Sequence, residues 1–405
     1  MQGKRLKTAL LLVIVAAVLA VAGLGGLAST ADAKTAAGTG ANAPAPYKVG
    51  IVYSRTGLLA AYGAQYIQGL RYGLAYATKG TNAVNGRKIE LTLADDGTDP
   101  VKAVSAAKDL IGKGYKILAG SASSGVALQM APLAEQNKIL FISGPAASDA
   151  VTGINKYTFR SGRQTYQDVK TSATFLKGAG RKVVVFAQDS AFGAGNYAAV
   201  NAVVGGQGHA VSRLLVPLSA QDFTPFAQQA KQANPDLLFI AWAGTTGPAM
   251  YRALTQQGVF GVSNKVVTGL PERATWQSFG EAATRIDFLS HYVPQGPKNK
   301  VNDFLVSSMR KRGQVPDIFT PDGFVAGQMI VRALTEAKGD NVDRMISALE
   351  GWNFVGPKGQ QSIRQSDHAM IQPMFQVKLV ANGTRFTPRV TARIKGQFVA
   401  PPERR

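Results

Sequence analysis

The sequence has no cysteine and only three histidines among its 405 residues. Without cysteine, the chain can form no disulfide and cannot carry a lipid on an N-terminal cysteine. The fold must therefore be held together by its core alone, and apolar residues make up 45% of the chain, which is enough for real cores. At this length we expect two or three domains.

Catalytic motifs are equally scarce. His209, His291 and His368 lie far apart, and the chain contains no zinc-protease motif, no nucleophile elbow and no phosphate-binding loop. A dinucleotide fingerprint matches 193–198, but the loop before it is too long for the tight turn that such a site needs. We therefore predict that the protein is not an enzyme and holds no cofactor and no metal. A hydrolase that uses a serine with His368 remains an alternative.

Acidic residues are few. The chain has 24 Asp and Glu against 45 Lys and Arg, so its formal net charge is +21. Such a charge attracts polyanions, for example nucleic acid, anionic lipid head groups or cell-wall polymers. The basic residues are scattered singly except at 310–312 and 404–405. We interpret most of them as a solvated surface and predict no nucleic-acid partner; a polyanion-binding envelope protein remains an alternative.

Only one apolar run is long enough to suggest contact with a membrane, and it lies at the N-terminus. Residues 9–27 carry no charge, Lys4, Arg5 and Lys7 precede them, and Ala31-Asp32-Ala33 follows as a cleavage site. We predict a signal peptide over 1–33, with an uncleaved membrane anchor as the alternative. Residues 34–46, rich in Ala, Gly and Pro, predict a disordered tether. The expected location is exported, periplasmic or extracytoplasmic, and soluble.

From residue 47 onward, strands alternate with helices, which predicts an α/β fold with parallel sheets. The same order restarts after residue 157, so we expect two similar lobes. The predicted strands are 47–53, 88–94, 117–119, 139–142, 157–160, 182–187, 211–216, 237–242, 266–268 and 372–380. The predicted helices are 60–77, 101–111, 126–137, 165–176, 196–205, 223–232, 248–257, 299–312 and 321–350.

Two serine-rich loops stand out, because each follows a short buried strand. The first contains Ser123, Ser124 and Gly125 and precedes a helix; the second contains Ala146, Ala147 and Ser148. Ligands of open parallel sheets bind at the carboxyl ends of the strands, and the N–H groups of a helix start favour a carboxylate. The alternative is that the serines only cap helices and make turns.

Other candidate ligand-binding residues follow predicted strands in both halves of the chain, as in a clamp between two lobes. Tyr62, Phe192 and Trp242 supply aromatic surface, although Trp242 could belong to the core. Glu272 follows Gly269-Leu270-Pro271 and could hold an ammonium group. The alternative for Glu272 is an acid at the start of a helix.

These pieces together resemble the periplasmic solute-binding proteins of branched-chain amino-acid (Leu/Ile/Val) ABC transporters. The matching pieces keep the family's order over nearly the whole mature chain: 48–51, 56–57, 62–63, 95–96, 99–100, 120–124, 139–143, 192–195 and 269–272. The resemblance implies the type 1 periplasmic binding fold, with two Rossmann-like lobes joined by a three-crossover hinge. It assigns 47–163 and 294–368 to lobe 1, and 164–293 and 369–405 to lobe 2.

The resemblance also implies roles for the candidate residues. The loops at 123–125 and 146–148 would grip the ligand's carboxylate, Glu272 would hold its ammonium, and Tyr62, Phe192 and Phe319 would line the side-chain pocket. The partners implied are a small ligand, an amino acid or another small carboxylate, and the membrane permease of an ABC transporter. The alternative function is the ligand-sensing component of an extracellular receptor system.

Overall fold

The computed structural model describes residues 44–383 and 385–404. The predicted signal peptide, 1–33, lies outside the described residues, and so does most of the predicted tether, 34–46. Within the described ranges, no helix combines the length and the apolar character that crossing a membrane requires.

The first lobe is built on a six-stranded sheet in the order β2-β3-β1-β4-β5-β6. Every pair is parallel except the β2–β3 hairpin, where Asn85 and Gly86 both take the positive φ of a tight turn. The strands are β1 (Tyr47–Tyr53), β2 (Ala83–Val84), β3 (Arg87–Asp95), β4 (Ile117–Gly120), β5 (Leu140–Ser143) and β6 (Thr158–Arg160).

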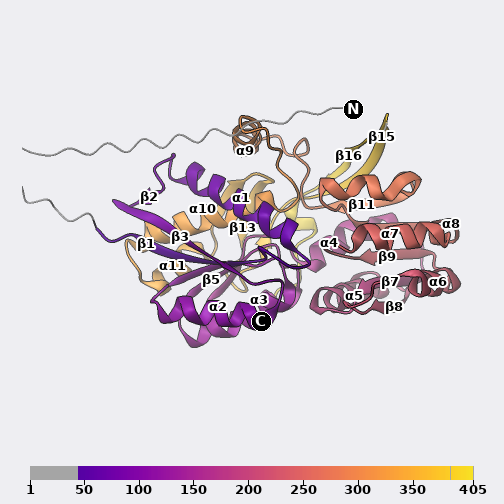
Figure 1. Cartoon of the computed structure of the whole chain (residues 1–405), viewed down its shortest axis with the longest axis horizontal. Coiled ribbons are helices and arrows are strands. Elements are labelled where there is room, and N and C mark those ends of the chain that lie inside the picture. Colours follow the sequence, from indigo (N-terminus) through magenta and orange to yellow (C-terminus); the bar gives the residue numbers. More distant parts are fainter. Residues whose placement is uncertain (1–43, 384, 405) are drawn as a thin grey trace, which may run out of the picture. The chain divides into compact units, whose positions relative to one another are not determined.

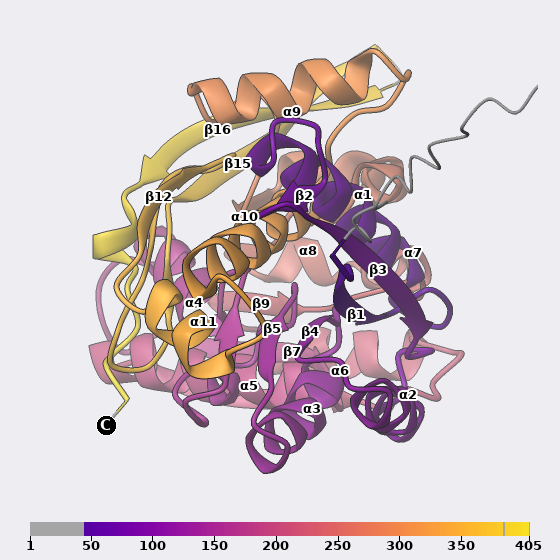
Figure 2. The same cartoon turned by 90° about the vertical axis from the view of Figure 1, so that its left-hand side faces the viewer.

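Helices cover both faces of this sheet, which is why β4 and β5 are short, fully buried apolar strands. Figures 1 and 2 show α1 (Ala60–Ala77) and α10 (Thr320–Ala337) on one face, and α2 (Pro100–Gly112) and α3 (Ser124–Gln136) on the other. α1 and α10 approach so closely that a Cβ on Gly69 would lie 1.9 Å from the carbonyl oxygen of Thr320.

The helix predicted over 321–350 is two helices, and that prediction is corrected here. α10 ends at Ala337, because Lys338 takes a left-handed φ of 50° that no helix continues. Asn341 then caps α11 (Val342–Leu349) by accepting a hydrogen bond from the N–H of Arg344. The helix predicted over 299–312 is α9 (Lys300–Arg310), which Asn299 caps.

The second lobe is built on a seven-stranded sheet in the order β16-β15-β11-β10-β9-β7-β8. Its core strands run parallel, whereas β15 pairs antiparallel with β11 and β16. The strands are β7 (Lys182–Gln188), β8 (Ala210–Val216), β9 (Leu237–Ala241), β10 (Lys265–Gly269), β11 (Ile286–Ser290), β15 (Met374–Asn382) and β16 (Arg385–Ile394).

Separate apolar clusters lie on the two faces of this second sheet. α4 (Thr165–Ser172) and α5 (Ala191–Val203) cover one face; α6 (Thr224–Ala233), α7 (Gly247–Gln256), α8 (Val259–Val262) and the 3-10 segment η4 (Arg273–Thr284) cover the other. α5 begins five residues before the predicted start at 196, because Ser190 caps it by accepting from the N–H of Gly193. Sequence reasoning missed β11 and β16.

The chain passes between the lobes three times, after β6, after β11 and before β15. This arrangement of two α/β lobes and three crossovers confirms the predicted fold class. A three-stranded antiparallel sheet, β12 (Asn353–Gly356), β13 (Gly359–Ile363) and β14 (Met370–Ile371), precedes the third crossover.

The C-terminal tail differs from its predicted assignment to the second lobe. Arg364 donates to the carbonyl oxygen of Pro401 at 2.8 Å, and the N–H of Arg404 donates to Asp367 at 3.1 Å. Arg404 also donates through its guanidinium to the carbonyl oxygen of Thr152. These polar contacts attach residues 401–404 to the segments that we assigned to lobe 1.

Candidate functional site

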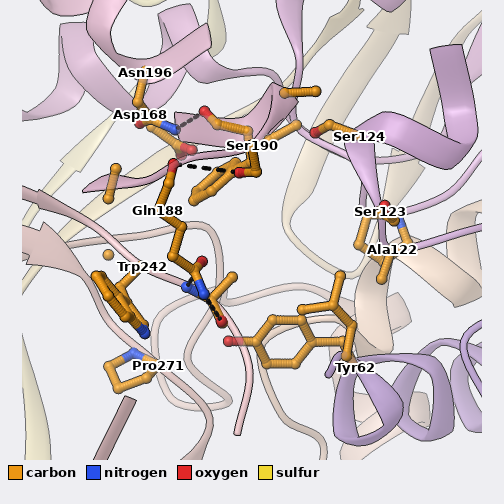
Figure 3. Close-up of a pocket in the computed structure, with 18 of the residues that line it drawn as sticks. Tyr62, Ala122, Ser123, Ser124, Asp168, Gln188, Ser190, Asn196, Trp242 and Pro271 are labelled. Carbon is orange, nitrogen blue, oxygen red and sulfur yellow. Dashed lines mark hydrogen bonds between the residues drawn. The ribbon is translucent and has the colours of Figure 1, made fainter. Parts of the chain in front are cut away.

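A cavity of about 270 Å³ lies where the carboxyl ends of the strands of both sheets meet. The first lobe contributes loops that follow β1, β4 and β5, and the second lobe contributes loops that follow β7, β9, β10 and β11. Figure 3 shows Ser123, Ser124 and Ala122 on one side of this cavity, Asp168, Asn196 and Ser190 on a second, and Tyr62, Trp242 and Pro271 on a third.

The N-terminus of α3 lines the cavity, as the position of the first serine-rich loop predicts. Ser123 is the capping residue; its hydroxyl accepts from the N–H of Val126 at 3.4 Å. Ser124 and Gly125 occupy the first two helical positions, where backbone N–H groups have no acceptor within the helix. This end of the cavity therefore offers hydrogen-bond donors and the positive end of a helix dipole.

A second helix start, from the other lobe, lines the same cavity. Ser190 caps α5, and Ala191 and Phe192 follow it along the cavity wall. Gln188 holds the neighbouring loop in place, because its side-chain amide exchanges two 3.0 Å hydrogen bonds with the backbone of Ala243. The cavity therefore lies between two capped helix N-termini, and this fits an anionic ligand group.

The three residues of the predicted second loop, 146–148, differ in whether they line the cavity. Ala147 lines the cavity, whereas Ala146 and Ser148 are buried beside it. The carbonyl oxygens of Ala146 and Ser148 accept from the guanidinium of Arg160 at 3.1 and 3.0 Å. The N–H of Ser148 donates to the hydroxyl of Ser124 at 3.2 Å. Ser148 thus orients Ser124, and its own hydroxyl accepts from the N–H of Ala150.

The predicted aromatic residues all line the cavity. Tyr62 and Phe319 are in ring contact at 4.5 Å, and the phenol oxygen of Tyr62 accepts from the N–H of Gly244 in the opposite lobe at 3.2 Å. Burial, followed by the charge of Glu272, raises the pKa of this phenol, which therefore stays protonated. Trp242 also belongs to the core: its ring stacks on Phe186 and its indole N–H donates to Thr246.

Glu272 does not lie among the residues that line the cavity. It precedes η4, and its Oε1 accepts from the hydroxyl of Thr275 at 2.7 Å. Its Oε2 is buried, with no hydrogen-bond partner among the described residues. The position matches the alternative of an acid at a helix start, and one carboxylate oxygen is left for another partner.

Three further residues line the cavity that sequence reasoning missed: Arg163, Asp168 and His291, all at most 5% exposed. Nε of Arg163 lies 3.2 Å from Oδ2 of Asp168, and NH1 donates to the carbonyl oxygen of Pro145 at 2.7 Å. The His291 ring stacks on Phe319 at 5.1 Å. Burial raises the pKa of Asp168 to about 6, and burial, Arg163 and Lys358 lower that of His291.

Local sequence patterns do not predict that these three residues line a ligand site. Arg163 and Asp168 flank the start of α4, where charged residues are usually solvated, and His291 follows β11, a strand that sequence reasoning missed. One sequence feature could have pointed to Arg163 and Asp168, namely the short buried strand at 158–160. Polar residues that directly follow the carboxyl end of a parallel strand lie near the ligand site in such folds.

Residues 46–384 match the family of periplasmic binding proteins. The chain is 23% identical over 355 residues to a Leu/Ile/Val-binding protein homolog 6 from Brucella melitensis, covering 85% of this chain and 90% of the relative. A crystal structure of an ABC-type branched-chain amino acid transporter from Rhodopseudomonas palustris CGA009 matches at 32% identity and a TM-score of 0.72, covering 87% and 97% of the two chains.

A second solved structure adds a different ligand. It is a solute binding protein of an ABC transporter from Rhodopseudomonas palustris BisB5, in complex with 3,4-dihydroxy benzoic acid. It is 25% identical to this chain with a TM-score of 0.76, and the match covers 87% of this chain and 98% of the other. With the family match over most of its length and the two-lobed geometry described above, this chain belongs to the periplasmic binding protein family.

Proposed function

We propose that this protein binds a small carboxylate in the cavity between its lobes and delivers it to the membrane permease of an ABC importer. The observation that carries the proposal is the start of α3, where Ser124 and Gly125 line the cavity and their N–H groups have no acceptor within the helix. Such a helix start stabilises a carboxylate by its hydrogen bonds and its dipole. The names of the relatives support the transport role.

The walls favour a ligand with an apolar, aromatic-sized body. Tyr62, Phe192, Trp242 and Phe319 surround the cavity, and aromatic faces pack well on flat ligands. The related solute binding protein from Rhodopseudomonas palustris BisB5 holds 3,4-dihydroxy benzoic acid, an aromatic acid. We therefore place aromatic acids first among the small carboxylates.

A branched-chain amino acid is the second candidate, and one observation favours it. Oε2 of Glu272 is buried without a hydrogen-bond partner among the described residues, so it could accept from an ammonium group. Against it, Glu272 lies outside the set of cavity-lining residues, and its other oxygen is bound to Thr275.

The remaining roles follow from the transport proposal. The protein would be exported by the predicted signal peptide, residues 1–33, and would act as a binding protein without catalysis. Its two lobes, 47–163 with 294–368 and 164–293 with 369–400, would close on the ligand by a hinge motion. The bond between Tyr62 and Gly244 joins the two lobes beside the cavity in the present structure.

Two substitutions at one position test the carboxylate grip. Ser124→Ala removes the hydroxyl, whereas Ser124→Pro removes the hydroxyl and the backbone N–H together. Proline suits the first helical position, and α2 already begins with Pro100 after its cap, Asp99. We expect Ser124→Pro to bind benzoate at least about tenfold more weakly than Ser124→Ala, because a charge-assisted hydrogen bond is lost.

The measurement is isothermal titration calorimetry on protein freed of copurifying ligand by unfolding and refolding. Thermal unfolding of both variants controls for folding. Mass spectrometry of the released ligand gives an independent answer. Equal affinity of the two variants for benzoate would contradict the carboxylate grip at the start of α3. An amino acid as the released molecule would contradict the aromatic-acid proposal.

A further inference from the structure

Three buried side chains that line the cavity, Arg163, Asp168 and His291, have polar atoms without a hydrogen-bond partner among the described residues, and the last two carry the argument. Asp168 is 4% exposed and His291 is 3% exposed. Among the described residues, neither Oδ1 of Asp168 nor either ring nitrogen of His291 has a hydrogen-bond partner. A buried polar atom without a partner destabilises the folded protein, so a site that keeps several of them is expected to satisfy them with a ligand or with water.

The separation of the two side chains suits one atom that hydrogen-bonds to both. Nδ1 of His291 lies 3.9 Å from Oδ1 of Asp168, which is too long for a direct hydrogen bond. Stacking on Phe319 orients the imidazole, while Arg163 engages the other oxygen of Asp168 at 3.2 Å. The two unpartnered atoms therefore stand side by side on the same cavity wall and are held there by their neighbours.

The charges around this pair disfavour a second ionised group. Arg163 already balances Asp168, and burial, together with the charges of Arg163 and Lys358, lowers the pKa of His291 and keeps its ring neutral. A ligand carboxylate would face the Asp168 charge, and an ammonium would face Arg163 and Lys358. Burying an unbalanced charge in such a place is costly.

A neutral imidazole has one donor and one acceptor nitrogen, and the carboxylate is acceptor only. A ligand group that hydrogen-bonds to the imidazole of His291 and to the carboxylate of Asp168 at the same time must therefore be neutral and have one donor and one acceptor. A hydroxyl has this character, because it can donate to Oδ1 of Asp168 and accept from an N–H of His291.

We propose that Asp168 and His291 together bind a hydroxyl group of the ligand, so that the substrate class is a hydroxylated carboxylic acid. This inference rests on the proposed function, in which the start of α3 holds the carboxylate of the same ligand. The hydroxyl site then acts as a specificity site at a different part of the same cavity.

The first test compares matched probes on the wild-type protein: benzoate, 3-hydroxybenzoate and 4-hydroxybenzoate, titrated by calorimetry. A site built to hydrogen-bond a hydroxyl rejects the analogue that lacks it. We expect at least one hydroxybenzoate to bind about tenfold or more tightly than benzoate. If benzoate binds as well as both, the hydroxyl site is wrong while the carboxylate proposal stands; if none of the three binds, both are wrong.

The second test uses two buried histidines as a matched pair. His368 also stacks on a phenylalanine, Phe159 at 3.8 Å, but its ring nitrogens contact the carbonyl oxygen of Thr158 and a carboxylate oxygen of Glu350. We expect His291→Phe to reduce the preference for the hydroxylated acid over benzoate to within about twofold. The control His368→Phe should keep the preference.

A conservative variant separates hydrogen bonding from shape. His291→Gln retains one donor and one acceptor, so we expect it to recover part of the preference that His291→Phe loses. An undiminished preference in His291→Phe would overturn the assignment of His291. Should that variant fail to fold, the comparison of probes on the wild-type protein still decides the proposal.

Discussion

Two buried clusters of charged residues lie near the crossovers, and they differ in whether their members line the cavity. In the first, the ammonium of Lys358 donates to Asp322 at 2.8 Å and to Gln372 at 2.9 Å, and the Lys358 and Asp322 side chains are fully buried. In the second, Asp168 and His291 line the cavity, whereas Lys358, Asp322 and Gln372 do not. Each cluster keeps polar atoms without a hydrogen-bond partner among the described residues, namely Oδ2 of Asp322 and Nε2 of Gln372 in the first, and Oδ1 of Asp168 and both ring nitrogens of His291 in the second. The first has the character of a structural link and the second that of a ligand site.

The contrast teaches that burial of a charged group does not by itself mark a functional site. Lys358 draws its partners from the protein, so removing it should cost folding free energy. His291 leaves hydrogen-bonding capacity unused, so removing it should cost ligand selectivity. Stability and affinity measured on the same variants can therefore separate the two clusters.

The largest effect that we expect is on stability, from Lys358→Met. The substitution leaves the carboxylate of Asp322 buried without its cation, which costs about 3–5 kcal/mol of the free energy of unfolding. Urea denaturation of the ligand-free protein measures this. By contrast, His291→Phe should be neutral or slightly stabilising in the same assay, because it removes unpartnered nitrogens.

A matched control for Lys358→Met is Lys113→Met, since Lys113 forms an exposed pair with Asp109 at 2.7 Å. Such a surface pair contributes about 1 kcal/mol or less. If both lysine variants lose the same stability, or if His291→Phe is as destabilising as Lys358→Met, the distinction between the two clusters fails.

A smaller effect should appear in the pH dependence of stability. The pKa of Asp168 is raised to about 6 in the folded protein from an ordinary 3.8, so folding favours its protonated form. The folded state therefore loses stability as the pH rises from about 4 through 6 and the group ionises. The free energy of unfolding of Asp168→Asn, measured relative to that of the wild type, should therefore rise by about 1 kcal/mol between pH 5 and pH 7.

Denaturation series at the two pH values measure that difference, with Asp109→Asn as the exposed control. The expected sign is the decisive point, because a carboxylate whose charged form stabilised the fold would show the opposite trend. A difference that stays constant between pH 5 and pH 7 would contradict the raised pKa.

The smallest effect that we expect is that of Glu272→Gln on the binding of aromatic acids. Glu272 lies outside the cavity lining and bonds to Thr275, so benzoate affinity should change by less than about twofold. The same variant titrated with leucine tests the second candidate ligand. A loss of leucine binding of tenfold or more, with wild-type leucine affinity above that for the benzoates, would move the ligand class to amino acids.

The sequence alone predicted the α/β class and most elements, because each depends on local patterns. The helix at 60–77 matches α1, and Asp99 with Pro100 marks the start of α2 as predicted. The start of α3 as a cavity-facing loop could also be predicted, since parallel strands present their carboxyl ends together. The placement of Tyr62, Phe192 and Phe319 in one cavity followed from the family resemblance.

Tertiary structure alone decided the rest. Arg163, Asp168 and His291 meet because two crossovers, separated by more than a hundred residues, pack side by side, and no local pattern records that approach. It also decided that Ser148 orients Ser124 and that Glu272 bonds to Thr275. Backbone periodicity determines where a chain forms helices and strands, whereas the partner of a buried polar atom depends on segments that only the folded chain brings together.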